Sequence, residues 1–212
     1  MGQRSHGQEP DNSFSAPRRQ SPANTLVQWI SLLPGTYNAA MSQPGTKTPD
    51  ISRASRPAEE PAKAGSRLRD LGVILPTPPS PLGAYVETSQ AGSLLFISGT
   101  LPLIDGKLAI SGRIGRDLTV NQGQEAARLA ALTALAAAKE YIGDLDKLTK
   151  LVKLTVLLTT TEDFTEHATV ADGASNLFVQ LFGSEAGHVR VVYGVYSMPV
   201  GTPVIVETIF EL

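Results

Sequence analysis

The sequence predicts an α+β protein in which one mixed β-sheet carries two α-helices on one face, behind a disordered N-terminal extension. Residues 1–66 are rich in Ser, Pro, Gly, Gln and Asn and poor in apolar side chains, which is typical of a disordered chain. From residue 67 onwards, short strand-like runs stand before, between and after two helical segments. That order favours helices on one face of a sheet. We therefore divide the chain into an extension, residues 1–66, and one domain, residues 67–212.

Composition excludes several classes of function. The 212 residues are 42% hydrophobic and 18% charged, and the formal net charge is −2. A protein that clamps a nucleic-acid backbone normally needs clustered Lys and Arg, so we expect no nucleic-acid partner. The chain has no cysteine, which excludes disulfides, thiolate nucleophiles, iron–sulfur clusters and zinc sites built on sulfur.

The extension contains one apolar run, residues 26–33, which is far shorter than the ~20 residues that cross a bilayer. We expect no membrane partner.

Arginines among serines are typical of a mitochondrial presequence, whereas acidic residues are not; the extension holds Arg4, Arg18 and Arg19 but also Glu9 and Asp11. The expected location is cytoplasmic, with the mitochondrion as the alternative. Translation from Met41 is an alternative that would shorten the extension.

The domain opens with two β-rich runs, residues 84–88 and 93–101, separated by residues 90–92 in the manner of a hairpin. A turn at residues 105–107 precedes a further short run, residues 108–111, which would extend the sheet.

The first helix has the clearest signals. Thr119 and Gln122 form a capping-box pattern, the helical stretch runs to about Tyr141, and Gly143 ends it. Small side chains let this helix approach a sheet closely; they are Ala126, Ala127, Ala130, Ala134 and Ala137.

The strand at residues 152–159 alternates apolar side chains with mostly polar ones, which indicates one buried face. A second helix begins between Asp163 and Gly173 and ends at Gly183. Its apolar stripe, which should face the sheet, consists of Val170, Ala174, Leu177, Phe178 and Leu181.

Two final strands, residues 190–198 and 204–212, flank a turn at residues 199–203. A sheet covered on one side leaves its other face bare. Several apolar side chains are expected on that bare face: Leu157, Val191, Tyr193, Val195 and Phe210. Bare faces of several copies that meet at a symmetric centre would bury them, so we predict an oligomer.

Common catalytic patterns are missing from the sequence. There is no Gly-x-Ser-x-Gly nucleophile turn, and residues 112–116 lack the spacing of a phosphate-binding loop. His167 beside Glu166 or Asp163 matches no known metal site, so we expect no metal ligands.

Arg190 is the strongest candidate for ligand binding. It opens an apolar strand, where a guanidinium is costly to bury unless it meets an anion. Its planar fork suits a carboxylate ligand. The alternative is a structural salt bridge to Glu207, Glu185 or another acid.

Several segments of the domain together resemble the Rid family, also called RidA/YjgF and labelled endoribonuclease L-PSP. They are residues 81–86, 95–99, 190–199 and 203–207, and residues 75–79, 123–128 and 171–175 are similar to one branch of the family. The resemblance covers residues 67–212 and none of the extension.

The resemblance implies a chorismate-mutase-like fold assembled as a homotrimer with clefts between subunits. In such clefts, reactive enamines and imines such as 2-aminoacrylate are hydrolysed to 2-oxo acids and ammonia without a cofactor. The resemblance assigns Arg190 to the carboxylate of a small substrate and places Tyr85 in the cleft from the neighbouring chain. It also adds Ser98 and Gly99 to the substrate-binding residues.

Two positions depart from the family pattern. Ile205 replaces the glutamate that positions or activates water in active members. Glu207, the next acid, points to the same face but lies ~6.6 Å farther along the strand, which makes it a weak candidate base. The small polar pair that follows the arginine is replaced by Val191 and Val192.

Three hypotheses follow. The first is an enamine or imine deaminase with altered specificity, in which Arg190, Tyr85 and Glu207 act on the substrate. The second is a non-catalytic trimeric module that binds a small carboxylic acid, which Ile205 favours. A ribonuclease ranks last, because the acidic chain lacks a basic aromatic surface.

Overall fold

The computed structural model describes residues 63–212. Its helices are α2 (Ala64–Asp70), α3 (Val120–Ile142) and α4 (His167–Phe182). Its strands are β1 (Thr88–Ala91), β2 (Leu94–Thr100), β3 (Leu103–Ile104), β4 (Lys107–Leu108), β5 (Lys150–Thr159), β6 (Val189–Val195) and β7 (Val204–Glu211). Short 3₁₀ turns occur at Leu145–Lys147, Ser184–Ala186 and Pro199–Gly201.

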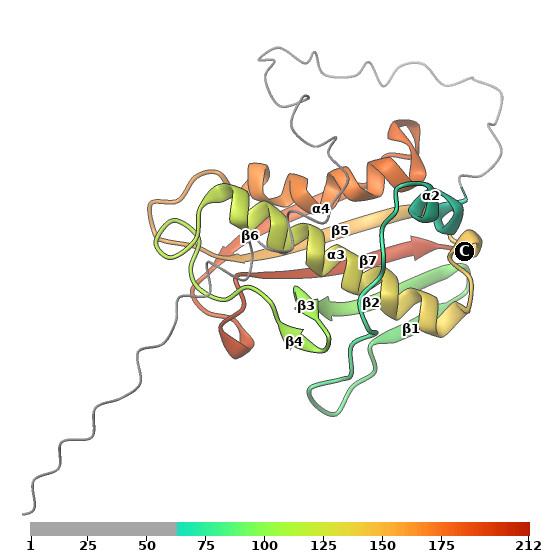
Figure 1. Ribbon diagram of the computed structural model, residues 1–212, viewed down its shortest axis with the longest axis horizontal. Helices are drawn as coiled ribbons and strands as arrows, with labels where there is room; N and C mark the ends of the chain where they lie inside the picture. Colours follow the sequence, from blue (N-terminus) through green and yellow to red (C-terminus); the bar gives the residue numbers. More distant parts are fainter. Residues whose placement is uncertain (1–62) are drawn as a thin grey trace, which may run out of the picture. The chain divides into compact units, whose positions relative to one another are not determined.

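The main sheet has the strand order β1-β2-β7-β5-β6 (Figure 1). It is mixed, because β5 and β6 run parallel and are joined through α4, whereas the other neighbours are antiparallel. Helices α3 and α4 pack against each other and cover one face of the sheet. The predicted α+β fold is therefore confirmed, and the other face carries no helix of the described residues.

Helix α3 forms as the sequence predicts. The Thr119 hydroxyl accepts from the Gln122 amide while the Gln122 side chain accepts from the Thr119 amide, and Gly143 ends the helix. These contacts satisfy amide groups that the first turn leaves free. The predicted stripe is buried, with Ala126, Ala127, Ala130 and Ala134 fully inaccessible. The small side chains let α3 lie close to α4 and to the sheet.

The helix-covered face of the sheet holds the core. Leu154, Val156 and Leu158 of β5 are inaccessible to solvent, as the alternating pattern predicts. Phe210 of β7 is also inaccessible and packs against Phe178 of α4 with ring centroids 5.7 Å apart. The placement of Phe210 on the bare face was therefore wrong, because it shares the parity of Val204 and Val206, which face the helices.

The other members of the predicted apolar group follow the opposite parity. Leu157 of β5 lies beside Tyr193 of β6 and Ile205 of β7 across the bare face. Tyr193 is 55% exposed in one chain. An apolar strip therefore crosses this face and is available to a second copy.

The structure differs from the predicted elements at three points. Residues 84–87 form a loop, and the first strand is β1, which joins β2 through a turn at Gly92 and Ser93. Leu108 pairs with Leu103 in the separate β3–β4 hairpin, so residues 108–111 do not extend the main sheet. Helix α2 was not predicted; its contacts are with α4 and with the 3₁₀ turn at Leu145–Lys147. Long-range packing decided each of these points.

The predicted extension lies almost wholly outside the described residues. This includes the apolar run at residues 26–33 and the presequence-like arginines, so the division at residue 66 stays a prediction. Residues 64–66 are described and belong to α2. Within residues 63–212, no helix is both long and apolar enough to cross a membrane.

Candidate functional site

Arg190 lies on the edge strand β6, beside Leu154 of β5. Its side chain therefore points to the helix-covered side. Nη1 donates to Asp172 Oδ1 at 2.7 Å and to Ser175 Oγ at 3.0 Å, and both acceptors belong to α4. The salt-bridge partner is thus Asp172, whereas the considered partner Glu207 lies on the opposite face of the sheet.

The guanidinium keeps part of its binding capacity. A guanidinium has five N–H donors in a fixed plane. Arg190 uses only Nη1 for hydrogen bonds within the described residues, and 24% of its side chain remains exposed. The edge formed by Nε and Nη2 has the geometry that holds a carboxylate with two parallel hydrogen bonds. Asp172 therefore orients Arg190 through Nη1, and this edge makes no hydrogen bond within the described residues.

His188 completes the group. Its Nε2 lies 3.0 Å from Ser175 Oγ, the same oxygen that accepts from Arg190. The direction of this hydrogen bond depends on the tautomer of His188, because the Ser175 hydroxyl can donate or accept. Burial and the nearby charge of Arg190 lower the pKa of His188, which favours the neutral imidazole. We call these four residues, Asp172, Ser175, His188 and Arg190, the Arg190 cluster.

A second polar region lies on the bare face. The pairing of β2 with β7 shifts between Ile97 and Thr100, so Ser98 and Gly99 form a β-bulge. Beside it is a cavity of about 340 Å³, which we call the bulge hollow. Its lining includes Glu87, Ser98, Gly99, Lys153, Thr155 and Glu207. Bulges redirect side chains and are common beside active sites.

Ile205 closes the space next to the bulge. A Cβ atom on Gly99 would lie 2.8 Å from Ile205 Cγ2, so only a glycine fits at this position without movement of the isoleucine. The position at which the family pattern has a glutamate therefore holds an apolar side chain packed against the bulge.

Tyr85 reaches the bulge hollow through Glu87. The Tyr85 hydroxyl accepts from the Leu82 amide at 3.1 Å and donates to Glu87 Oε1 at 3.5 Å. The Glu87 carbonyl in turn accepts from the Ser98 amide at 2.8 Å. The other carboxylate oxygen, Glu87 Oε2, is buried and has no hydrogen-bond partner among the described residues. Burial raises the pKa of Glu87.

Within one chain the predicted site residues fall into two groups. Ser98, Gly99 and Glu207 meet in the bulge hollow, and Tyr85 adjoins it. Arg190 stands apart, because it points to the helix-covered side of the sheet and Glu207 to the bare side. Tyr85 precedes β1, at the edge opposite β6, whereas the hollow extends to Lys153 and Thr155 of β5.

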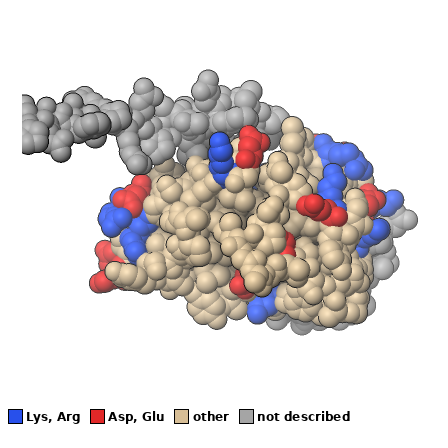
Figure 2. Space-filling model, turned by 90° about the horizontal axis from the view of Figure 1, so that it is seen from below, with Lys and Arg blue, Asp and Glu red and all other residues tan. Residues whose placement is uncertain are grey.

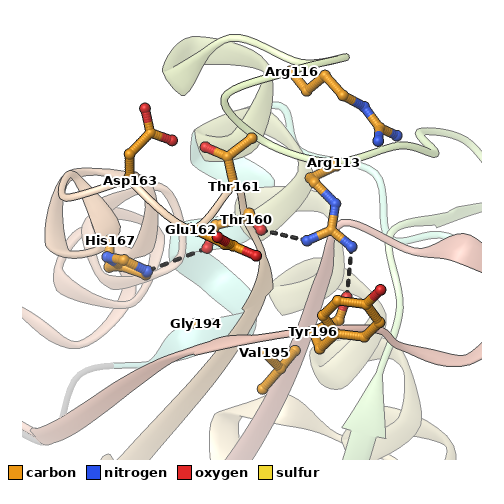
Figure 3. A pocket seen from close by; sticks show the side chains of 10 residues that line it. All are labelled: Arg113, Arg116, Thr160, Thr161, Glu162, Asp163, His167, Gly194, Val195 and Tyr196. Atoms are coloured by element: carbon orange, nitrogen blue, oxygen red, sulfur yellow. Dashed lines mark hydrogen bonds between the residues drawn. The ribbon is translucent and has the colours of Figure 1, made fainter.

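Another cavity, of about 770 Å³, lies at the C-terminal ends of β5 and β6 (Figure 3). Arg113 donates to the Thr160 and Tyr196 carbonyls there and lies over the Tyr196 ring, and so ties the two strand ends together. A Cβ on Gly194 would lie 2.6 Å from His167 Nε2, which explains the glycine. These contacts are structural, and no predicted site residue lines this cavity. The described residues contain no group of three or more metal ligands.

No role was predicted for Asp172, Ser175, His188 or Glu87. Asp172 and Ser175 are three residues apart on α4, so they share a helix face, and that spacing was the available signal. Their meeting with Arg190 depends on where α4 crosses β6. Nothing in the sequence singled out Glu87. It lies within the predicted strand at residues 84–88, whereas in the structure it belongs to the loop before β1.

Comparison with known proteins gives a consistent result. Residues 65–212 match a family model described as "YjgF/chorismate_mutase-like, putative endoribonuclease". Protein TCP17 of Trypanosoma cruzi is 38% identical over 151 residues, which cover 71% of this chain and 94% of that protein. Two crystal structures are also similar. One, a "putative endoribonuclease" from Shewanella oneidensis MR-1, is 35% identical with a TM-score of 0.68, covering 71% of this chain and 99% of its own. The other, Atu1372 from Agrobacterium tumefaciens, is 36% identical with a TM-score of 0.65. The match covers 70% of this chain and 92% of that one.

Proposed function

Because the chain belongs to the RidA/YjgF, chorismate mutase-like family, we propose that it is a hydrolase of reactive enamines and imines that releases a 2-oxo acid and ammonia. The observation that carries this proposal is the Arg190 cluster. It presents a partly buried guanidinium, oriented by Asp172 and Ser175, with an unused edge that suits the carboxylate of a small substrate.

Hydrolysis of an imine requires only orientation of the substrate and water and the transfer of protons. In the imine form of the substrate the carbon is electrophilic, and water adds to it to form a carbinolamine that expels ammonia. A site that holds the carboxylate, keeps a water beside the imine carbon and moves protons supplies orientation and acid–base catalysis. We assign the carboxylate to Arg190, one wall and a proton-donating hydroxyl to Tyr85, and contacts with the substrate to the Ser98–Gly99 bulge.

We propose that the complete site forms only between copies of the chain. The Arg190 cluster lies on the helix-covered side of the sheet and the bulge hollow on its bare face, so a head-to-tail contact is needed to bring them together. Such heterologous contacts close into rings. A ring also buries the apolar strip that includes Tyr193 and Leu157. The resemblance to the family favours a homotrimer.

A second function is favoured by one specific observation. Ile205 stands at the position of the family's water-activating glutamate and packs against Gly99. A trimer with Arg190 but without that glutamate would bind a small carboxylic acid without converting it. Ribonuclease activity is less well supported, since Lys and Arg are interspersed with Asp and Glu on the face shown in Figure 2.

The test generates imines in place with an amino-acid oxidase or a serine dehydratase and follows release of the 2-oxo acid while semicarbazide competes for the imine. The full chain is compared with Arg190→Ala and with Arg190→Lys, which keeps the charge but loses the fork. Arg69→Ala is the matched control, because Arg69 is exposed on α2.

Acceleration by the full chain that is lost in Arg190→Ala and retained in Arg69→Ala is the expected result. A chain that is inactive until Ile205→Glu is introduced would instead identify a binding module on an enzyme's scaffold. Equal activity of Arg190→Ala and the full chain would refute the role of Arg190. The sedimentation coefficient of the same samples tests the trimer.

A further inference from the structure

Glu87 and Glu207 are the two carboxylates that line the bulge hollow, and their surroundings differ. Glu207 is exposed on β7. Glu87 is partly buried, and no donor among the described residues reaches its Oε2. A buried carboxylate oxygen without a partner costs free energy. Because Oε2 is inaccessible to solvent in one chain, its desolvation raises the affinity of the Glu87 carboxylate for a proton.

The position of Glu87 is fixed by its neighbours. Its carbonyl accepts from the Ser98 amide, which attaches this residue to the bulge, and its Oε1 accepts from the Tyr85 hydroxyl. Glu87 and Glu207 therefore stand on opposite sides of the bulge. Both line the same cavity of about 340 Å³, which has room for a small substrate.

We propose that Glu87 is the general base of this site and performs the task for which the family pattern has a glutamate where this chain has Ile205. The inference rests on the proposed deaminase function. It requires no rearrangement of Ile205, because Glu87 approaches the Ser98–Gly99 bulge from the loop before β1 whereas Ile205 approaches it from β7.

The proton transfers balance with Glu87 alone. Its carboxylate takes a proton from water as the water oxygen bonds to the imine carbon, and the C=N electron pair moves to nitrogen, which receives that proton. In the second step Glu87 takes the proton of the new hydroxyl group and passes it to the nitrogen. The C–N bond breaks, the C=O bond forms, and ammonia leaves.

The electrostatics agree with this role. A base works best when its pKa lies near the working pH, and burial moves the pKa of Glu87 upwards from the ordinary carboxyl value. The Tyr85 hydroxyl acts in the opposite direction by favouring the carboxylate. The other charged groups that line the hollow are Lys153 of β5 and Glu207 of β7.

The experiment compares Glu87→Gln with the full chain in the imine assay, across acidic to neutral pH. Glu140→Gln is the matched control, because Glu140 is an exposed carboxylate on α3. We expect Glu87→Gln to lower kcat/KM about 10²-fold or more and to remove the acidic limb of its pH profile. We expect Tyr85→Phe to move that limb to higher pH, since the hydroxyl lowers the pKa of Glu87. Thermal unfolding of Glu87→Gln should be unchanged or shifted upwards, because a buried carboxylate is removed.

The outcomes separate this inference from the proposed function. Loss of activity in Arg190→Ala together with full activity and an unchanged pH profile in Glu87→Gln would leave a deaminase with another base. Loss of activity in Glu207→Gln alone would make Glu207 that base. An inactive full chain refutes both proposals. A large fall in the melting temperature of Glu87→Gln, with no shift of the limb in Tyr85→Phe, would show that Glu87 is structural.

Discussion

The close contact of Gly173 with the backbone of α3 affects both the packing of the core and the position of the Arg190 cluster. Gly173 lies in α4 between Asp172 and Ser175, at the crossing with α3. A Cβ atom at this position would lie 2.0 Å from the Gln124 carbonyl oxygen, 2.7 Å from its carbonyl carbon and 2.9 Å from its Cα. All three atoms are backbone, so no change of rotamer can relieve the clash.

The size of the effect of Gly173→Ala follows from these distances. Non-bonded carbon atoms prefer separations of about 3.5–4.0 Å, so the two helices must move apart by on the order of 1 Å. Overpacking costs about 1–3 kcal/mol, and the rigid backbone contact places this case at the upper end. Alanine regains about 1 kcal/mol of helix propensity over glycine. We expect a net loss of about 2 kcal/mol in the free energy of unfolding.

Urea unfolding followed by circular dichroism measures this difference. Asn176→Ala is the matched control, since Asn176 is exposed on the same helix, and its effect should stay within about 0.5 kcal/mol. The displacement of α4 should also separate Asp172 and Ser175 from Arg190 and reduce binding of small carboxylates. A midpoint for Gly173→Ala equal to or above that of the unaltered chain would refute the close approach of α3 and α4.

Three further predictions follow from single contacts. Burial and Arg190 lower the pKa of His188 in the folded chain, so the unfolded chain binds more protons below the ordinary histidine pKa of about 6.5. The free energy of unfolding should therefore fall as the pH drops through that value, and urea titrations of a His188→Gln chain should show a smaller fall. Thr119→Ala removes the capping box of α3 and should cost about 1 kcal/mol in thermal unfolding, whereas no loss would mean that the cap is replaced. Gly99→Ala should destabilise by about 1–3 kcal/mol through Ile205 Cγ2, and adding Ile205→Ala should restore part of that loss; a double-mutant cycle without coupling contradicts the contact.

Local signals were sufficient for much of the fold. The capping box at Thr119 and Gln122, the stop at Gly143 and the alternation along β5 depend on residues close together in the chain. Their physical causes act over one or two turns or along one strand, so the pattern alone predicted them correctly. Arg190 was found in the same way, because a charged residue at the start of an apolar strand requires a partner.

Tertiary structure decided which residues meet. Asp172 and Ser175 reach Arg190 only because Gly173 lets α4 lie close to α3 while the chain crosses from β5 to β6. Glu87 enters the bulge hollow because its carbonyl pairs with Ser98, a contact set by the register of β1 on β2. Phe210 faces the helices because it lies an even number of residues from Val204 and Val206, whose side chains are buried on that face of the sheet. Register, parity and helix crossing come from packing between distant segments, which neighbouring residues do not determine.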